Sequence, residues 1–248
     1  MNALSTLFIA HLKMRFREPA VVFFLYAFPL LLLLVFGLMF GHTTAQLGGA
    51  SVGYVELHVP ALAVLAMATI AFQQIPSSTA AQREVGILRT LRAHHLKPWV
   101  YIIAELAVNV VMVVLSTGLL LLASTLFFGL QFRGSALWVF ACLVFCSVSL
   151  FSIGYLIACA VPSSRLAGAI GNFLFFPMMF LSGIAVPIHE MPEMVGMVGS
   201  WSPLGQAVTL MQSAWRGVEP SAVVPELSVL AVLLVVSALL AFRWFRWQ

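Results

Sequence analysis

The residues that could act as metal ligands or acid–base groups are few and poorly spaced for catalysis. His94 and His95 are adjacent, so on a helix their side chains point about 100° apart and are badly placed to bind one metal ion together. His189 and Glu190 are followed by Glu193, a pattern more typical of a solvated helix turn than of a metal or protonation site. The sequence therefore predicts no metal centre.

The three cysteines also indicate packing rather than chemistry. Cys142 and Cys146 share one face of a predicted helix, and Cys159 lies in the same apolar region. With no histidine or acid nearby, they are expected to act as small buried side chains.

Motifs for nucleotide binding and hydrolysis are missing from the sequence. It contains no GxxxxGK[ST] or HExxH pattern, and its eight acidic residues are all glutamate. Five of the six predicted spans lack an ionisable group at mid-depth, where a proton-coupled carrier would need one. We therefore expect a protein that is not an enzyme, binds no cofactor and takes its energy from elsewhere.

The composition places the chain in a membrane. Apolar residues make up 62% and charged residues 8%, with a mean hydropathy of +1.07, whereas soluble domains carry about 25% charged residues. The apolar runs are near 20 residues long, which indicates helices rather than the strands of a barrel. The predicted fold class is all-α, a polytopic membrane protein with six transmembrane helices.

The six spans are expected within a single transmembrane domain covering residues 1–248. An amphipathic helix over residues 2–17, with Lys13, Arg15 and Arg17 near its end, should lie in the membrane surface before the first span. A cleaved signal peptide is the weaker alternative, because the apolar run that follows is longer than a signal core. The spans are predicted at residues 20–40, 59–81, 99–128, 136–161, 166–187 and 223–242.

The positive charges predict the orientation. Of the twelve Lys and Arg residues, only Arg133 and Arg216 fall outside the termini and the even-numbered connections between spans. By the positive-inside rule, both termini are cytoplasmic, in a multi-pass protein of the plasma or inner membrane. The same distribution argues against nucleic acid as a partner.

Several polar residues near the membrane have two interpretations. Glu105 either reaches the cytoplasmic interface or has a partner inside the bundle, and we expect the interface. The residues Gln73, Gln74, Ser77 and Ser78 either line a water-filled cavity or belong to helix that has left the hydrocarbon, and we expect the second. Pro76 is expected to kink or break that helix.

The segment of residues 188–222 is expected on the outer face. Ser202 and Pro203 have the residue types of a helix N-cap and first position. The residues Leu204, Val208, Met211 and Trp215 then form one apolar face. This pattern predicts an amphipathic helix lying on, or dipping into, the outer leaflet.

The basic stretch of residues 82–98 is the longest polar run. Arg83, Arg89, Arg92 and Lys97 surround an apolar stripe of Val85, Leu88 and Leu91, with Glu84 as its one acid. A loop that obeys the positive-inside rule would explain the charges but not the stripe. We expect a cytoplasmic helix at about residues 83–96 that contacts another protein.

The whole chain resembles the membrane permease subunits of type-2 ABC exporters. The resemblance rests on the basic amphipathic N-terminus, on residues 83–92 (REVGILRTLR), and on Phe180-Leu181-Ser182-Gly183 followed by Trp201-Ser202-Pro203-Leu204. In that family the stretch after the second span is the coupling helix, which docks on a separate ATPase subunit; here Ile87 replaces the usual Thr. The resemblance assigns coupling to Arg83, Glu84, Val85, Gly86, Leu88, Arg89, Leu91 and Arg92.

The resemblance also implies partners and a substrate class. Two ABC ATPase subunits and a second permease copy, identical or paralogous, would complete an exporter embedded in membrane lipids. Its pathway would lie between spans two and five, with Asn172, Phe173, Phe176 and Phe180 as lining candidates. The Phe- and Met-rich interior suits hydrophobic or amphipathic substrates such as drugs, lipids or lipid-linked glycans, and polysaccharides are a further possibility in this family.

Two other function classes fit parts of the sequence. One is a membrane anchor or assembly protein without transport activity, whose basic loop recruits a soluble partner. The other is an ion-gradient-driven carrier, which should show a repeat between its two halves. Spans one to three and four to six show no such repeat.

Overall fold

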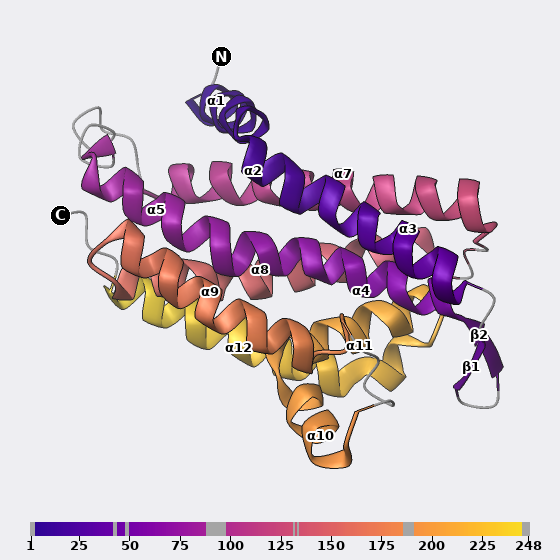
Figure 1. Ribbon diagram of the computed structural model, residues 1–248. Coiled ribbons are helices and arrows are strands. Elements are labelled where there is room, and N and C mark those ends of the chain that lie inside the picture. Colours follow the sequence, from indigo (N-terminus) through magenta and orange to yellow (C-terminus); the bar gives the residue numbers. More distant parts are fainter. Residues whose placement is uncertain are drawn as a thin grey trace.

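The computed structural model describes residues 3–41, 44–47, 50–87, 98–130, 132, 134–185 and 191–244. Within these residues, six helices are long and apolar enough to cross a membrane. They form one bundle with roughly aligned axes (Figure 1), which confirms the predicted fold class. The six spans are Pro19–Phe40, Tyr54–Glu84, Val100–Phe128, Ala136–Ala160, Ser164–Leu181 and Pro220–Arg243.

The two ends of the bundle differ in character. The basic end holds helix α1, the last turn of α5 and the last turn of α12, on the left of Figure 1. At the opposite hairpin end, strands β1 (Thr44–Leu47) and β2 (Ala50–Gly53) pair antiparallel, with Thr44 opposite Gly53. This hairpin was not predicted from the sequence and is a small exception to the all-α architecture.

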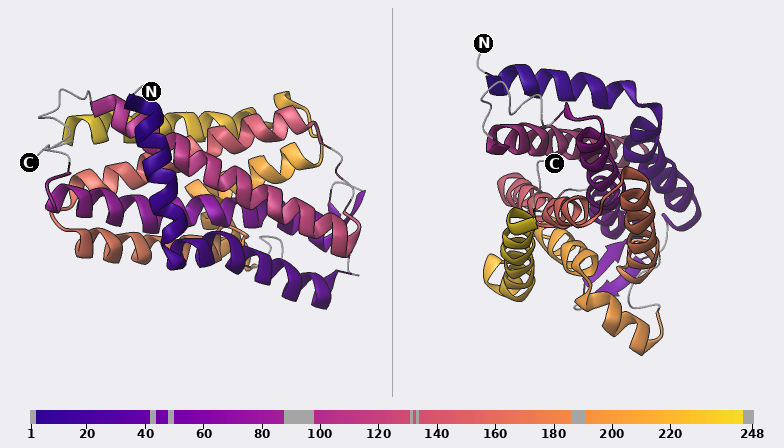
Figure 2. Two further views of the ribbon diagram at one scale, coloured as in Figure 1. Left: turned by 90° about the horizontal axis from the view of Figure 1, so that it is seen from above. Right: turned by 90° about the vertical axis from the view of Figure 1, so that its left-hand side faces the viewer.

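Helix α1 (Ala3–Arg17) runs across the spans rather than along them, as Figures 1 and 2 show. Glu18 is extended, as expected for a residue before proline, and Pro19 starts helix α2 (Pro19–Val22). The chain therefore turns sharply from α1 into span 1, consistent with the predicted interfacial helix.

Span 2 is the central element of the bundle. It joins α4 (Tyr54–Ala68), the π-helical segment η2 (Thr69–Gln74) and α5 (Ile75–Glu84), and 94% of its most apolar window is buried. The expected break at Pro76 is absent, because the wide π turn precedes the proline and absorbs the missing backbone donor. Span 1 also has a π-helical segment before a proline: η1 (Phe23–Ala27) precedes Pro29 in α3 (Phe28–Phe40).

Of the remaining spans, 3, 4 and 5 pack on this centre, and span 6 packs on span 4 and α11 (Pro203–Trp215). These four spans are α7 (Pro98–Phe128), α8 (Ala136–Ala160), α9 (Ser164–Leu181) and α12 (Val224–Trp244), the last preceded by the short 3-10 helix η4 (Pro220–Val223). The side chain of Ser163 caps α9 by accepting a hydrogen bond from the Leu166 amide at 3.3 Å. Span 5 therefore has a defined start at the basic end.

Two glycines let neighbouring helices touch the π-helical segment of span 2. A Cβ atom on Gly171 of α9 would lie 1.8 Å from the Phe72 carbonyl oxygen, and one on Gly154 of α8 would lie 2.2 Å from that of Ala71. Because no side chain fits in either space, both helices pack directly on the span 2 backbone.

The segment between spans 5 and 6 contains helices α10 (Glu193–Trp201) and α11 (Pro203–Trp215). Ser202 caps α11 as predicted, accepting a hydrogen bond from the Gly205 amide at 2.9 Å. The predicted location of α11 is wrong, however, because its apolar face (Leu204, Val208, Met211 and Trp215) is at most 1% exposed inside the bundle. The helix packs on α4, α8 and α12 instead of on lipid.

Helix α10 has the exposed apolar surface that was expected of α11. Met194, Met197, Val198 and Trp201 are each more than half exposed, and α10 projects from the bundle in Figure 1. The predicted helical segment between spans 5 and 6 is therefore present, and α10 rather than α11 has the exposed apolar surface.

Candidate functional site

A groove of about 830 Å³ opens between span 1, span 2 and span 5. The junction of α1 with span 1 provides one wall, including Glu18, Val21 and Phe24. The η2–α5 part of span 2 provides the second wall, and α9 provides the third. These three elements meet here because the Gly171 contact holds α9 against η2.

The span 2 wall is a strip of hydroxyl and amide groups. Thr69, Gln73, Gln74, Ser77 and Ser78 all line the groove. The last four of these therefore line a cavity, which was one of the two interpretations; their position relative to the hydrocarbon stays a prediction.

The hydrogen bonds of this strip leave acceptors and a donor unused. The hydroxyls of Thr69 and Ser77 donate to helix carbonyls of Leu65 and Gln73, at 2.9 and 2.6 Å, so their oxygen lone pairs remain as acceptors. The Gln74 side-chain nitrogen is buried and has no hydrogen-bond partner among the described residues. The strip can thus accept hydrogen bonds from a molecule in the groove, whereas the Gln74 nitrogen lies beneath the surface of the groove.

The structure brings only two of the four predicted pathway residues to this groove. Asn172 and Phe176 of α9 line it, and Phe176 and Phe24 of span 1 add two aromatic rings to the lining. Phe173 and Phe180 are not in the lining, and are 76% and 56% exposed on α9. The groove therefore combines the polar strip of span 2 with apolar side chains of span 1 and with both polar and aromatic residues of α9.

A buried ion pair lies beside the groove at the basic end. The Arg15 guanidinium is 3.2 Å from Glu105 Oε1, and it also donates to the Ser78 hydroxyl at 3.2 Å. The second oxygen of Glu105 accepts from the Tyr155 hydroxyl at 3.2 Å. Glu105 is 1% exposed, so the expected position at the interface is wrong and the alternative, a partner inside the bundle, is correct.

A second contact ties α1 to the same place. The His11 ring packs edge-on against Tyr101, with centroids 5.2 Å apart, and the Tyr101 hydroxyl donates to Gln82 of α5. Burial lowers the pKa of His11, and the positive charge of Arg15 lowers it further. The first turns of α7 therefore link α1 to the end of span 2.

The predicted coupling stretch begins differently from the expected helix at residues 83–96. Helix α5 continues through Glu84, and Gly86 has a φ of +77°, which favours glycine and ends the helix. Val85 is 78% exposed and Ile87 is 40% exposed just after this end. The other predicted coupling residues, Leu88, Arg89, Leu91 and Arg92, lie outside the described residues.

Arg83 and Glu84 make contacts within the chain. Arg83 donates to the carbonyls of Ala158, at 3.1 Å, and of Val161 at the end of α8. Glu84 accepts from both the amide and the hydroxyl of Ser164, at 2.8 and 2.7 Å. Both side chains, which the resemblance assigns to coupling with the ATPase, thus also make contacts at the turn between α8 and α9.

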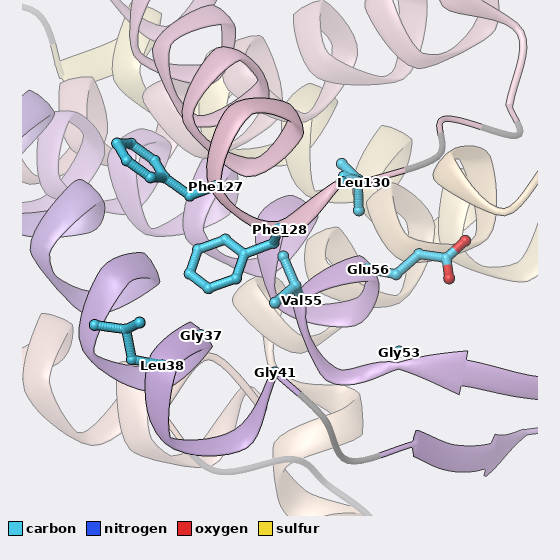
Figure 3. Close-up of a pocket in the computed structure, with 10 residues that line it drawn as sticks. Gly37, Leu38, Gly41, Gly53, Val55, Glu56, Phe127, Phe128 and Leu130 are labelled. Carbon is cyan, nitrogen blue, oxygen red and sulfur yellow. The ribbon is translucent and has the colours of Figure 1, made fainter.

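A further cavity of about 470 Å³ lies at the hairpin end (Figure 3). Its lining is mostly glycine and apolar side chains, and Figure 3 shows the Glu56 carboxylate directed away from Phe127 and Phe128. The described residues contain no cluster of His, Cys or acidic side chains that could hold a metal ion. The groove between spans 1, 2 and 5 is therefore the candidate site.

Comparison with protein families gives a match that covers α1 through α11. The model of the ABC-2 type transporter family matches residues 2–215. The chain belongs to this family. A comparison with curated proteins found no match. As an ABC-2 membrane domain, the chain is the permease part of a transporter, and its matched region contains the groove, the buried ion pair and the start of the coupling stretch.

Proposed function

We propose that this ABC-2 permease exports a hydrophobic or amphipathic substrate, such as a drug, a lipid or a lipid-linked glycan, out of the cytoplasm. ATP bound and hydrolysed by a separate ATPase subunit provides the energy. The observation that carries the proposal is the groove, whose lining combines the polar strip of span 2 with the apolar side chains of Val21, Phe24 and Phe176. An amphipathic molecule can place its hydrogen-bonding part on span 2 and its apolar part on these side chains.

The proposed orientation follows the charge distribution. Lys13, Arg15 and Arg17 of α1, with Arg83, Arg165 and Arg243, gather at the basic end. By the positive-inside rule this end faces the cytoplasm, in the plasma or inner membrane. The groove lining includes Arg15 and Arg165, so the groove opens near the cytoplasmic side.

The proposed ATPase contact starts where α5 ends. Val85 and Ile87 are exposed apolar side chains at the basic end, and the sequence continues the apolar stripe at Leu88 and Leu91. An apolar stripe flanked by arginines suits insertion into a groove of a soluble partner. Two ATPase subunits would serve two permease copies.

The second copy is proposed to pack on α9. Asn172 is exposed on this helix among Phe173, Phe176 and Phe180, and an amide facing lipid is costly. The exposed face of α12 is apolar by comparison, with Val232, Val235 and Leu239. A protein neighbour is therefore better suited to α9 than to α12.

The experiment that tests the proposed function is co-purification of an ABC ATPase subunit with the tagged permease from its native membranes. Val85→Asp should reduce the amount of bound ATPase and its ATP hydrolysis severalfold, because a carboxylate cannot enter an apolar groove without loss of hydration. Val85→Leu keeps an apolar side chain and is the control that should bind as the parent does. Absence of an ABC ATPase from the purified parent would contradict the proposal.

A further inference from the structure

The turn between α8 and α9 is held to the end of span 2 by two oppositely charged residues. Arg83 contacts the carbonyls of Ala158 and Val161, where the last turn of α8 leaves its carbonyls without helical partners. Glu84 contacts the amide of Ser164, the first residue of α9. The cation thus lies at a helix C-terminus and the anion at a helix N-terminus, the arrangement that helix dipoles favour.

These contacts lie at the start of the predicted coupling stretch. Glu84 is the last residue of α5, and Gly86 ends the helix two residues later. The next described helix is α7, which begins at Pro98. A displacement of the chain just after Glu84 therefore acts on the turn between α8 and α9 through these contacts.

Helix α9 leads from these contacts to the groove. It runs without interruption from Ser164 to Leu181, and both Asn172 and Phe176 on it line the groove. A displacement of its first turn therefore moves a wall of the groove. Arg165, next to Ser164, lines the groove as well.

We infer that Arg83 and Glu84 are positioning residues that join the coupling stretch to the N-terminus of α9, so that movement of the stretch moves the groove wall. This inference rests on the proposed function, in which a partner moves the stretch. It differs from the role expected from the sequence, where both residues contact the ATPase directly. The two roles predict different results when Glu84 is changed.

The test uses the permease–ATPase complex co-purified from native membranes and placed in lipid nanodiscs. Asn172→Cys provides a thiol in the groove, and its rate of maleimide labelling is measured with and without ATP. Cys142 and Cys146 are buried and Cys159 is partly buried, so labelling of the parent chain gives the background. With native Glu84, ATP should change the labelling rate severalfold.

The informative variants are Glu84→Gln and Ser164→Ala. Each should leave the amount of bound ATPase unchanged and should reduce the ATP-dependent change in labelling severalfold. The double variant should lose no more than the larger single loss, because both changes act on the same pair of residues, Glu84 and Ser164. Glu219→Gln is the matched control, since Glu219 also bonds a nearby serine, Ser221 at 3.4 Å, outside this turn.

The other outcomes are equally decisive. Loss of ATPase binding in Glu84→Gln would show direct docking and overturn the inference, while the proposed function would stand. The inference would also be overturned if Glu84→Gln bound the ATPase normally and showed the same ATP-dependent change in labelling rate as the parent. If the parent binds no ABC ATPase, the proposed function fails. Amide hydrogen exchange of the permease alone then tests whether Glu84 holds the N-terminus of α9. Faster exchange at the first turn of α9 in Glu84→Gln than in the parent would support that contact, and unchanged exchange would reject it.

Discussion

Arg15 and Glu105 are separated by most of a hundred residues in the sequence but form one buried cluster. Desolvation of two charges is costly, and the attraction between them offsets that cost only with further hydrogen bonds. Here Ser78 bonds the guanidinium and Tyr155 bonds the carboxylate. The cluster therefore anchors α1 to α5, α7 and α8 at a single point.

Removing one member of this pair should destabilise the protein strongly. Glu105→Ala leaves the Arg15 charge buried without its partner, and the expected loss is about 3–5 kcal/mol of unfolding free energy. It should appear as a lower midpoint of thermal unfolding in detergent. The double variant Arg15→Met/Glu105→Leu should recover most of the loss, and Glu193→Gln on exposed α10 should have no effect. A double variant as unstable as Glu105→Ala would argue against the ion pair as the cause.

His11 should make the attachment of α1 sensitive to pH. Its pKa lies below the ordinary 6.5 because of burial and Arg15, so below pH 6.5 the unfolded chain binds this proton more readily than the folded chain does. Stability is therefore complete above that pH and falls as the pH decreases towards the lowered pKa. The unfolding midpoint should fall less between about pH 7.5 and about pH 5.5 in His11→Leu than in the parent. Equal falls in both proteins would contradict this assignment.

At the scale of elements, the contact between span 5 and span 2 is the one that shapes the groove. Gly171→Ala would place a Cβ atom 1.8 Å from the Phe72 carbonyl oxygen, so α9 must move away from η2. We expect a loss of about 1–3 kcal/mol in unfolding free energy, measured by thermal unfolding. Gly168→Ala on the same helix is the control, because its Cβ atom would lie 3.9 Å from that of Ser77. Equal effects of the two substitutions would rule out the close approach as the cause.

The sequence predicted the helices themselves better than it predicted which surfaces they pack against. Apolar runs identified six spans, and the types of Ser202 and Pro203 identified a helix start that the structure confirms. An apolar helix face has the same pattern whether it contacts lipid or protein, so the burial of α11 was missed. The hairpin was missed too, although Gly48 and Gly49 between two short runs are a turn signal.

The polar site was harder to predict for a related reason. Glu105 lies two turns into its span, and only the fold shows that Arg15 and Tyr155 reach it. The polar strip of span 2 was seen in the sequence, but its exposure to a groove depends on where α1 and α9 lie. Of the candidate pathway residues, Asn172 and Phe176 line the groove because they share the side of α9 that faces span 2.

At the scale of the whole molecule, the spans differ in how far they are buried: span 2 is the core helix, and spans 1, 5 and 6 are the least enclosed. The apolar window of span 2 is 94% buried, whereas those of spans 1, 5 and 6 are 17–22% buried. Spans 1 and 5 border the groove and span 6 does not. A second permease copy placed on the groove side would complete the enclosure of a pathway between the two copies.

This arrangement predicts which face forms the dimer. Phe173→Cys places a thiol on the exposed face of α9, and Val235→Cys places one on the exposed face of α12, the same number of residues from the basic end of its helix. Oxidation in native membranes should link Phe173→Cys into a species of twice the chain mass, because equivalent residues meet near the axis of a symmetric dimer. Val235→Cys should remain a monomer on the same gel. Cross-linking of Val235→Cys alone would place the second copy on α12 and leave the groove facing lipid.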